Sequence, residues 1–139
     1  MKNATIIIVE TTVNAAIEKV WAFFTLPVHI IQWNTASDDW HTPKAINNLQ
    51  EGGRFASTMA AKDGSFSFDF CGTYNTIITH QHIAYTLDDT RKVGISFTVD
   101  NGAVKVVETF EAETENTLEL QQFGWQAILN NFKKYTEAN

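Results

Sequence analysis

The sequence predicts an α+β fold, in which a curved antiparallel sheet of about six strands surrounds a long C-terminal helix and two short helices follow the first strand. One observation is a helical apolar periodicity over residues 116–137. Another is a series of alternating strand patterns, separated by turn residues, over residues 54–111. The length of 139 residues suits one core. We therefore expect a single domain over residues 1–139.

The N-terminal part is expected to form a strand and a helical corner. Residues 4–13 are β-branched and alternate in character, as in a strand. Residues 16–25 place apolar side chains at helical spacing, and Pro27 ends this helix. The same proline suits the first position of a second short helix over residues 27–33. Residues 34–53 lack any periodicity and predict a long irregular loop.

The middle of the chain is expected to form a meander of five further strands. Turn residues separate them into residues 54–60, 66–78, 82–87, 92–99 and 103–111. Gly72 lies inside the longest of these strands, where it predicts a bulge or bend. Alternation then places one face of the sheet inward, and most of its members are aromatic or aliphatic. Among them are Phe66, Phe68, Phe70, Ile83, Tyr85, Leu87, Val93, Ile95, Phe97, Val99, Val104, Val106 and Phe110.

Two residues of the predicted core invite a functional interpretation. Glu108 shares the inward face with Val106 and Phe110, where a carboxylate needs a partner or has its pKa raised by burial. It could serve as a general base or hydrogen-bond anchor, or be a surface glutamate at a bulged strand. Gly124 interrupts the long helix, which Asn116 and Glu119 are expected to begin as a capping box. That glycine either opens the floor of a cavity or lets the helix approach the sheet closely.

Composition restricts the expected binding partners and the expected cellular compartment. A net charge of -6 lacks the basic surface that nucleic-acid binding needs, and no apolar run is long enough to span a membrane. The single cysteine, Cys71, and the absence of a signal-peptide pattern indicate the cytoplasm. His29 and His41 flank the predicted loop but are too loosely spaced for a metal signature. We expect no metal and no cofactor.

Several short motifs together resemble one known family. They are Val20-Trp21, Trp33, Trp40, L-x-x-G-G-R-F over residues 49–55, F-D-F-x-G-x-Y over residues 68–74, T-F-E over residues 109–111, and G-W-Q-x-x-L-x-x-F over residues 124–132. Their order over nearly the whole chain resembles the AHSA1-like family (activator of Hsp90 ATPase homologue 1-like) of the START/Bet v 1-like (SRPBCC) superfamily. The resemblance implies a helix-grip fold with an apolar ligand held between sheet and helix. It transfers no catalytic residue.

The aromatic content and the resemblance together give a list of pocket candidates. The chain has 17 Phe, Trp and Tyr residues, enough for a bulky core or an aromatic-lined cavity. The candidates are Trp33, Trp40, Phe55, Phe68, Phe70, Phe97, Glu108, Phe110, Gly124, Trp125 and Ile128. The tryptophans among them fit the mouth of a pocket and ordinary core packing equally well.

Three functions follow in order of preference. The first is binding of a small hydrophobic molecule in a cavity between the sheet and the C-terminal helix. The second is a cyclase- or hydrolase-type enzyme that uses a pocket carboxylate such as Glu108. The third is a chaperone-cofactor-like interaction module with an Hsp90-type partner. Ligand identity stays open, and the sequence fits a monomer and a homodimer equally well.

Overall fold

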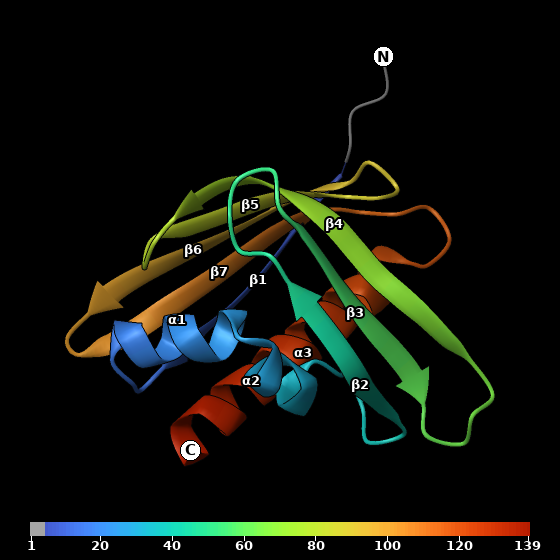
Figure 1. Ribbon diagram of the computed structural model, residues 1–139, viewed down its shortest axis with the longest axis horizontal. Helices are drawn as coiled ribbons and strands as arrows, with labels where there is room; N and C mark the ends of the chain where they lie inside the picture. Colours follow the sequence, from blue (N-terminus) through green and yellow to red (C-terminus); the bar gives the residue numbers. More distant parts are fainter. Residues whose placement is uncertain (1–4) are drawn as a thin grey trace.

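Within the described residues, 5–139 of this computed structural model, seven antiparallel strands curl over one long helix (Figure 1). In chain order the elements are β1 (Ile6–Val13), α1 (Ile17–Thr25), α2 (Pro27–Trp33), β2 (Trp40–Asn47), β3 (Arg54–Ala61), β4 (Ser67–Ile78), β5 (His82–Leu87), β6 (Lys92–Asp100), β7 (Ala103–Glu111) and α3 (Leu118–Ala138). The strand order is β1-β7-β6-β5-β4-β3-β2. This is the predicted α+β, helix-grip arrangement, with α3 under the arch of the sheet and α1 and α2 at one end.

The seventh strand, β2, lies where the sequence predicted an irregular loop. It forms one edge of the sheet and pairs with β3, with a register shift between His41 and Lys44. Pro43 lies within that shift. A proline has no N–H to donate to the hydrogen bonds between strands, so it is tolerated in edge strands and at bulges. The interrupted strand lacks the alternation that marks the others, so the prediction of a loop over residues 34–53 was wrong for residues 40–47.

The ends of two other elements also differ from expectation. The first residue of the predicted N-terminal strand, Ala4, lies outside the described residues. Helix α3 begins two residues later than expected, with Thr117 as its N-cap, whose Oγ1 accepts a hydrogen bond from the Leu120 N–H at 3.1 Å. The predicted capping box of Asn116 and Glu119 was therefore wrong. The Asn116 N–H instead donates to Glu113 Oε1 at 2.8 Å, which keeps Asn116 in the preceding loop.

Side chains of α3 form hydrogen bonds with backbone groups along the free edge of β1. Gln126 accepts a hydrogen bond from the Glu10 N–H at 3.3 Å and donates one to the Glu10 carbonyl at 2.9 Å. Lys133 Nζ donates to the Thr12 carbonyl at 2.6 Å. These bonds replace those that a further strand would make, which blunts an exposed edge. They also fix α3 along the β1 side of the sheet.

Gly72 allows a close contact and does not form the bulge that the sequence predicted. The register shift in β4 lies between Tyr74 and Thr76, a little beyond the expected position. A Cβ at Gly72 would lie 2.8 Å from the Phe55 ring and 2.8 Å from the Thr86 carbonyl oxygen. The glycine therefore lets the Phe55 ring lie against the backbone of β4.

Replacing Gly72 by alanine is accordingly expected to destabilise the protein by about 1–3 kcal/mol, since Phe55 and the strand must move apart. The matched control is Gly124→Ala, because a Cβ at Gly124 meets no atom within 4 Å. That helical substitution should stabilise by up to about 1 kcal/mol. Urea unfolding measures both changes, and equal effects of the two substitutions would contradict this account of Gly72.

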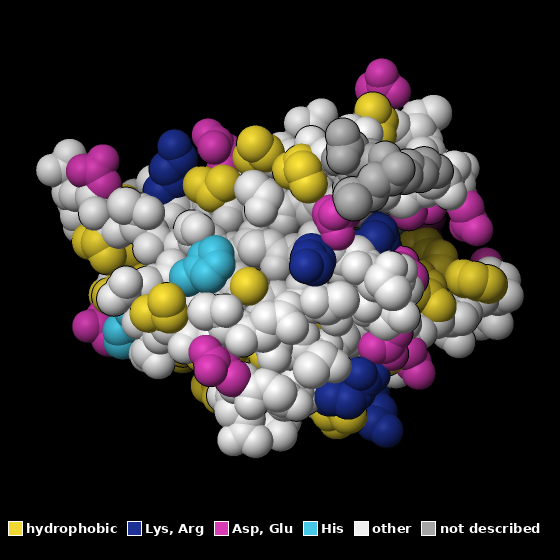
Figure 2. Space-filling view, turned by 90° about the horizontal axis from the view of Figure 1, so that it is seen from above, with side chains coloured by type: hydrophobic (Ala, Val, Ile, Leu, Met, Phe, Trp, Pro, Cys, Tyr) yellow, Lys and Arg dark blue, Asp and Glu magenta, His cyan; other side chains and the backbone are white. Residues whose placement is uncertain are grey.

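The outer face of the sheet shows no gathering of one kind of side chain. Seen from above the arch, hydrophobic, basic and acidic side chains lie scattered among polar ones (Figure 2). Apolar residues of β1 such as Ile6 and Ile8 are exposed there singly. Among residues 5–139 no helix combines the length and apolar character that crossing a bilayer would take. The buried apolar surface is thus concentrated on the inner face, toward α3.

Candidate functional site

The inner face of the sheet is built from rows of residues that lie opposite one another on neighbouring strands. One row crosses the middle of the sheet and contains Val9, Glu108, Ile95, Ile83 and Ile77. Glu108 is the only charged member of this row, because every other position carries an aliphatic side chain. We call it the middle row.

An aromatic cluster lies on one side of the middle row, where the helices meet the sheet. Its members are Trp21, Phe24, Trp33, Phe97 and Phe132, with neighbouring ring centroids 5.0–5.4 Å apart. We call it the helical cluster. Trp33 and Phe97, two of the predicted pocket residues, belong to it. The Trp33 Nε1–H donates to the Phe23 carbonyl at 2.9 Å, so this indole is already anchored within the core.

A second aromatic group lies on the other side of the middle row and is called here the sheet cluster. It consists of Phe55, Phe70, Tyr74, Tyr85, Phe110 and Trp125. Trp125 of α3 stacks on Phe110 with ring centroids 3.8 Å apart and planes at 11°. The edge of Phe70 meets the same indole at 6.0 Å. Four predicted pocket residues are thus brought together here, namely Phe55, Phe70, Phe110 and Trp125.

Glu108 lies between the two clusters with its side chain turned inward. The residue is 8% exposed, and burial raises the pKa of its carboxyl to about 8. None of the side-chain hydrogen bonds among residues 5–139 involves this carboxyl. Among residues 5–139, Thr136 Oγ1 is the one polar side-chain atom that is both fully buried and without a hydrogen-bond partner. The Glu108 oxygens also lack a partner, so they are not fully buried and still touch solvent-accessible space. With that pKa, the carboxyl is mostly protonated and neutral at pH 7.

Tyr85 is a second unpartnered polar group on the inner face. It is also 8% exposed, and no hydrogen bond within residues 5–139 involves its hydroxyl. Burial, followed by the charge of Glu108, raises its pKa well above the usual range. Its neighbour Tyr74 differs, because the Tyr74 hydroxyl donates to Asn47 Oδ1 at 2.6 Å. The sequence placed Tyr85 on the inner face without suggesting a site role, since the alternation carries no information about partners.

Trp40 and Phe68 lie apart from the other predicted pocket residues. Phe66 and Phe68, expected on the inner wall, are 60% and 43% exposed at the β3–β4 hairpin end of the sheet. Both rings lie near Trp40, at 6.1 and 6.0 Å. The expectation that these two phenylalanines line the core was wrong, because the sheet extends past its cover at that end. They form an exposed aromatic corner.

Two surface hollows flank this exposed corner. One, of about 420 Å³, lies between β2 and the end of α3 and includes Trp40 and Tyr135 in its lining. The other, of about 540 Å³, lies at the β3–β4 hairpin and includes His41 and Phe66. Neither hollow is lined by Glu108 or Tyr85. A site at the surface and a site at the inner face are therefore distinct alternatives in this molecule.

The remaining two pocket candidates belong to α3. Ile128 is half-buried and packs against the core. Around Gly124 there is open space where a side chain would begin, so this glycine is not needed for close approach of the helix to the sheet. Of the two interpretations offered by the sequence, the one based on close packing was wrong.

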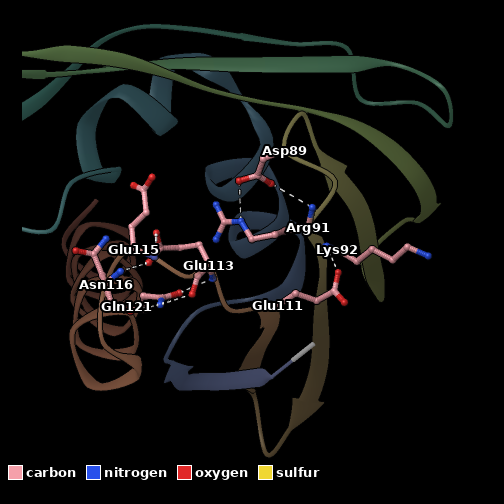
Figure 3. A network of polar contacts seen from close by, with 8 residues as sticks. All are labelled: Asp89, Arg91, Lys92, Glu111, Glu113, Glu115, Asn116 and Gln121. Carbon is pink, nitrogen blue, oxygen red and sulfur yellow. Dashed lines mark hydrogen bonds and ion pairs between the residues drawn. The ribbon is translucent and has the colours of Figure 1, made fainter. Parts of the chain in front are cut away.

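A polar network closes the end of the fold next to the sheet cluster (Figure 3). The Arg91 Nε–H donates to Asp89 Oδ2 at 2.8 Å in the β5–β6 turn, and the Arg91 side chain is 21% exposed. Its positive charge opposes, as the weakest of several influences, the rise in the Tyr85 pKa that burial causes. Opposite, the buried Gln121 donates to the Glu113 carbonyl at 3.1 Å and to the Asn116 carbonyl at 2.9 Å. Sequence analysis did not single out Arg91 or Gln121.

The histidines do not form a shared site in the described chain. His29 Nδ1 lies 2.8 Å from the Tyr135 hydroxyl, and its ring stacks on Phe23 at 3.9 Å. His41 belongs to β2 and lines both surface hollows. No three His, Cys, Asp or Glu side chains of residues 5–139 come together as metal ligands would.

Comparison with known proteins gives one family match. Residues 14–137 match the family model "Activator of Hsp90 ATPase homolog 1-like protein". The solution structure of an AHSA1-like protein from Aeromonas hydrophila is 45% identical, with a TM-score of 0.90, over 96% of this chain and 93% of that chain. A solution structure from Cytophaga hutchinsonii is 56% identical, with a TM-score of 0.83, over 96% and 92%.

More distant structures and curated proteins add less. A crystal structure from Chromobacterium violaceum has a TM-score of 0.85 at 19% identity, over 97% of this chain and 99% of that chain. At that identity the likeness shows the fold alone. A search of the curated proteins finds no match.

Proposed function

The chain belongs to the activator of Hsp90 ATPase homolog 1-like family, and on that premise we propose that it binds a small hydrophobic molecule between the sheet and α3. The single observation that carries the proposal is the pair of inward polar groups, Glu108 and Tyr85, that have no partner within residues 5–139. Both sit in an otherwise apolar wall. Buried polar groups are nearly always hydrogen-bonded, to protein or to ordered water. The Glu108 and Tyr85 oxygens are not among the fully enclosed atoms without a partner, so a partner from outside the chain can reach them.

The surroundings of the pair support the same function. Ligand sites are mostly apolar with a few placed polar groups, and the middle row with its flanking clusters has this composition. The first half of α3 leaves Leu118, Leu120 and Phe123 exposed, whereas Leu129 and Phe132 of the second half are fully buried. The first half is therefore held by fewer apolar contacts and is the part of α3 that can most readily move to admit a molecule.

Binding is tested with neutral naphthalenes as probes, by thermal shift and by quenching of tryptophan fluorescence. A compound that binds the folded chain at 100 times its Kd stabilises it by about 2.7 kcal/mol, which raises the Tm by several degrees. The shift should shrink in the variant Trp125→Ala and persist in Trp40→Ala, since only Trp125 faces the inner site. Failure of every neutral probe to shift the Tm, or loss of the shift in Trp40→Ala alone, would contradict the proposal.

A second candidate function, acid–base catalysis, draws support from the pKa of Glu108. A carboxyl with a pKa of about 8 is protonated at neutral pH and close to the range that suits a general acid. The test is to incubate each bound compound with the protein and to follow it by mass spectrometry. Conversion that disappears in Glu108→Gln while binding persists would favour catalysis. Recovery of unchanged compound favours binding alone.

A further inference from the structure

The environment of Glu108 and Tyr85 restricts the chemistry of the bound molecule. This inference rests on the proposed function and goes further by naming the class of ligand. Glu108 pairs with Ile95 across the sheet, and Tyr85 pairs with Val93, so the two residues lie on the strands that flank β6. With strands 4.8 Å apart and residues rising 3.4 Å each, their Cα atoms are roughly 12 Å apart. The two side chains, a glutamate and a tyrosine, are long enough for both to hydrogen-bond a single ligand oxygen placed between them.

Both groups are donors in the state that burial favours. A phenol carries its proton at neutral pH, and a buried carboxyl with a raised pKa carries one as well. Two donors on one face of the sheet that can both reach one point match one oxygen acceptor with two lone pairs, as in a ketone or an aldehyde. The rest of such a molecule would meet apolar side chains, because the helical cluster and the sheet cluster lie on the two sides of the middle row.

The same environment disfavours an anion. A carboxylate ligand would lose its hydration against aliphatic residues such as Ile83 and Ile95, which are 2% exposed. Arg91, whose charge acts on Tyr85, is already paired with Asp89 in the β5–β6 turn. We therefore propose that this chain selects a neutral, carbonyl-bearing hydrophobic molecule, whose oxygen accepts hydrogen bonds from Glu108 and Tyr85, over hydrocarbons and carboxylate anions of the same shape.

Three probes of nearly equal size test the selection, namely 2-acetylnaphthalene, 2-ethylnaphthalene and 2-naphthoate. Isothermal titration at pH 7 gives a Kd for each. We expect the ketone to bind about tenfold more tightly than the hydrocarbon, because two hydrogen bonds are gained, and at least about tenfold more tightly than the anion. Tyr85→Phe and Glu108→Leu should each lower the preference for ketone over hydrocarbon at least about threefold. The double variant should bring that ratio to about 1.

Two controls separate a specific contact from a structural effect. Glu108→Gln keeps a neutral donor at the same place and should preserve most of the preference. Tyr74→Phe removes a neighbouring hydroxyl that is already bonded to Asn47, so it should change stability and leave the ratio unchanged. A change of the ratio in Tyr74→Phe equal to that in Tyr85→Phe would overturn the assignment.

The outcomes also distinguish this inference from the proposed function. Equal affinity for the ketone and the hydrocarbon, unchanged in Tyr85→Phe and Glu108→Leu, would overturn the selection while leaving hydrophobic binding intact. If a water molecule, and not the ligand, bridges Glu108 and Tyr85, the ketone and the hydrocarbon would likewise bind with equal affinity. Absence of binding for all three probes would overturn the proposed function itself. Tighter binding of 2-naphthoate than of the ketone would overturn the exclusion of anions.

Discussion

Replacing Phe132 by alanine is expected to destabilise the protein by about 3–5 kcal/mol. The side chain is 0% exposed, and its ring meets Phe24 at 5.1 Å and Trp33 at 5.0 Å. Removing it leaves a void at the point where all three helices meet, and the rigid aromatic neighbours can collapse only partly into that void. Urea denaturation at pH 7 measures the loss, which is a large share of the 5–15 kcal/mol typical of a domain.

The control for this substitution lies on the same helix. Phe123 is 71% exposed, so Phe123→Ala removes the same atoms without leaving a cavity and should change stability by less than about 0.5 kcal/mol. Similar losses in the two variants would contradict the packing of α3 described here. A loss at Phe123 alone would mean that the opposite face of the helix is the buried one.

Replacing Glu108 by glutamine is expected to stabilise the protein, and increasingly so as the pH rises. The folded-state pKa of about 8 lies above the 4.5 of a glutamate in an unfolded chain, so the folded chain binds more protons than the unfolded chain between those pH values. Wild-type stability therefore falls from about pH 4.5 to about pH 8. A shift of one pKa unit corresponds to about 1.4 kcal/mol, which gives a gain for the glutamine variant of about 3 kcal/mol at pH 7 and under about 1 kcal/mol at pH 5.

The control for this pH series is a glutamate whose side chain is exposed. Glu115 is exposed in the loop before α3, so Glu115→Gln removes no buried group and should change stability by less than about 0.5 kcal/mol. Urea midpoints measured from pH 4.5 to pH 9 give the curves. A constant difference between Glu108→Gln and wild type over that range would mean that Glu108 is already ionised in the folded protein, and the raised pKa would be wrong.

The sequence was informative wherever one periodicity ran along a whole element. Alternation in β5, β6 and β7 placed Ile83, Ile95 and Glu108 on the inner face, and the structure agrees. It failed for β2, because Pro43 and the register shift break the pattern on an edge strand. For Phe66, Phe68 and Val99 the alternation showed which residues share a face and could not show where the cover of that face ends. Val99, expected on the inner face, is 57% exposed near the end of β6.

The candidate site was predictable only in part. The inward direction of Glu108 followed from its position between Val106 and Phe110, and its burial then accounts for the raised pKa. The difference between Tyr85 and Tyr74 did not follow, because it depends on Asn47, which β2 brings beside Tyr74 from a distant part of the chain. Local patterns predict the direction of a side chain, and tertiary contacts decide whether its polar atoms are satisfied.

The position of a bound molecule decides between a site inside the fold and a site at its surface. In the complex with 2-acetylnaphthalene, we expect intermolecular nuclear Overhauser effects between the probe and the methyl groups of Val9, Ile83 and Ile95, together with the indole of Trp125. Contacts confined to Trp40 and the exposed phenylalanines beside it would place binding at the surface hollows and contradict a site between the sheet and α3.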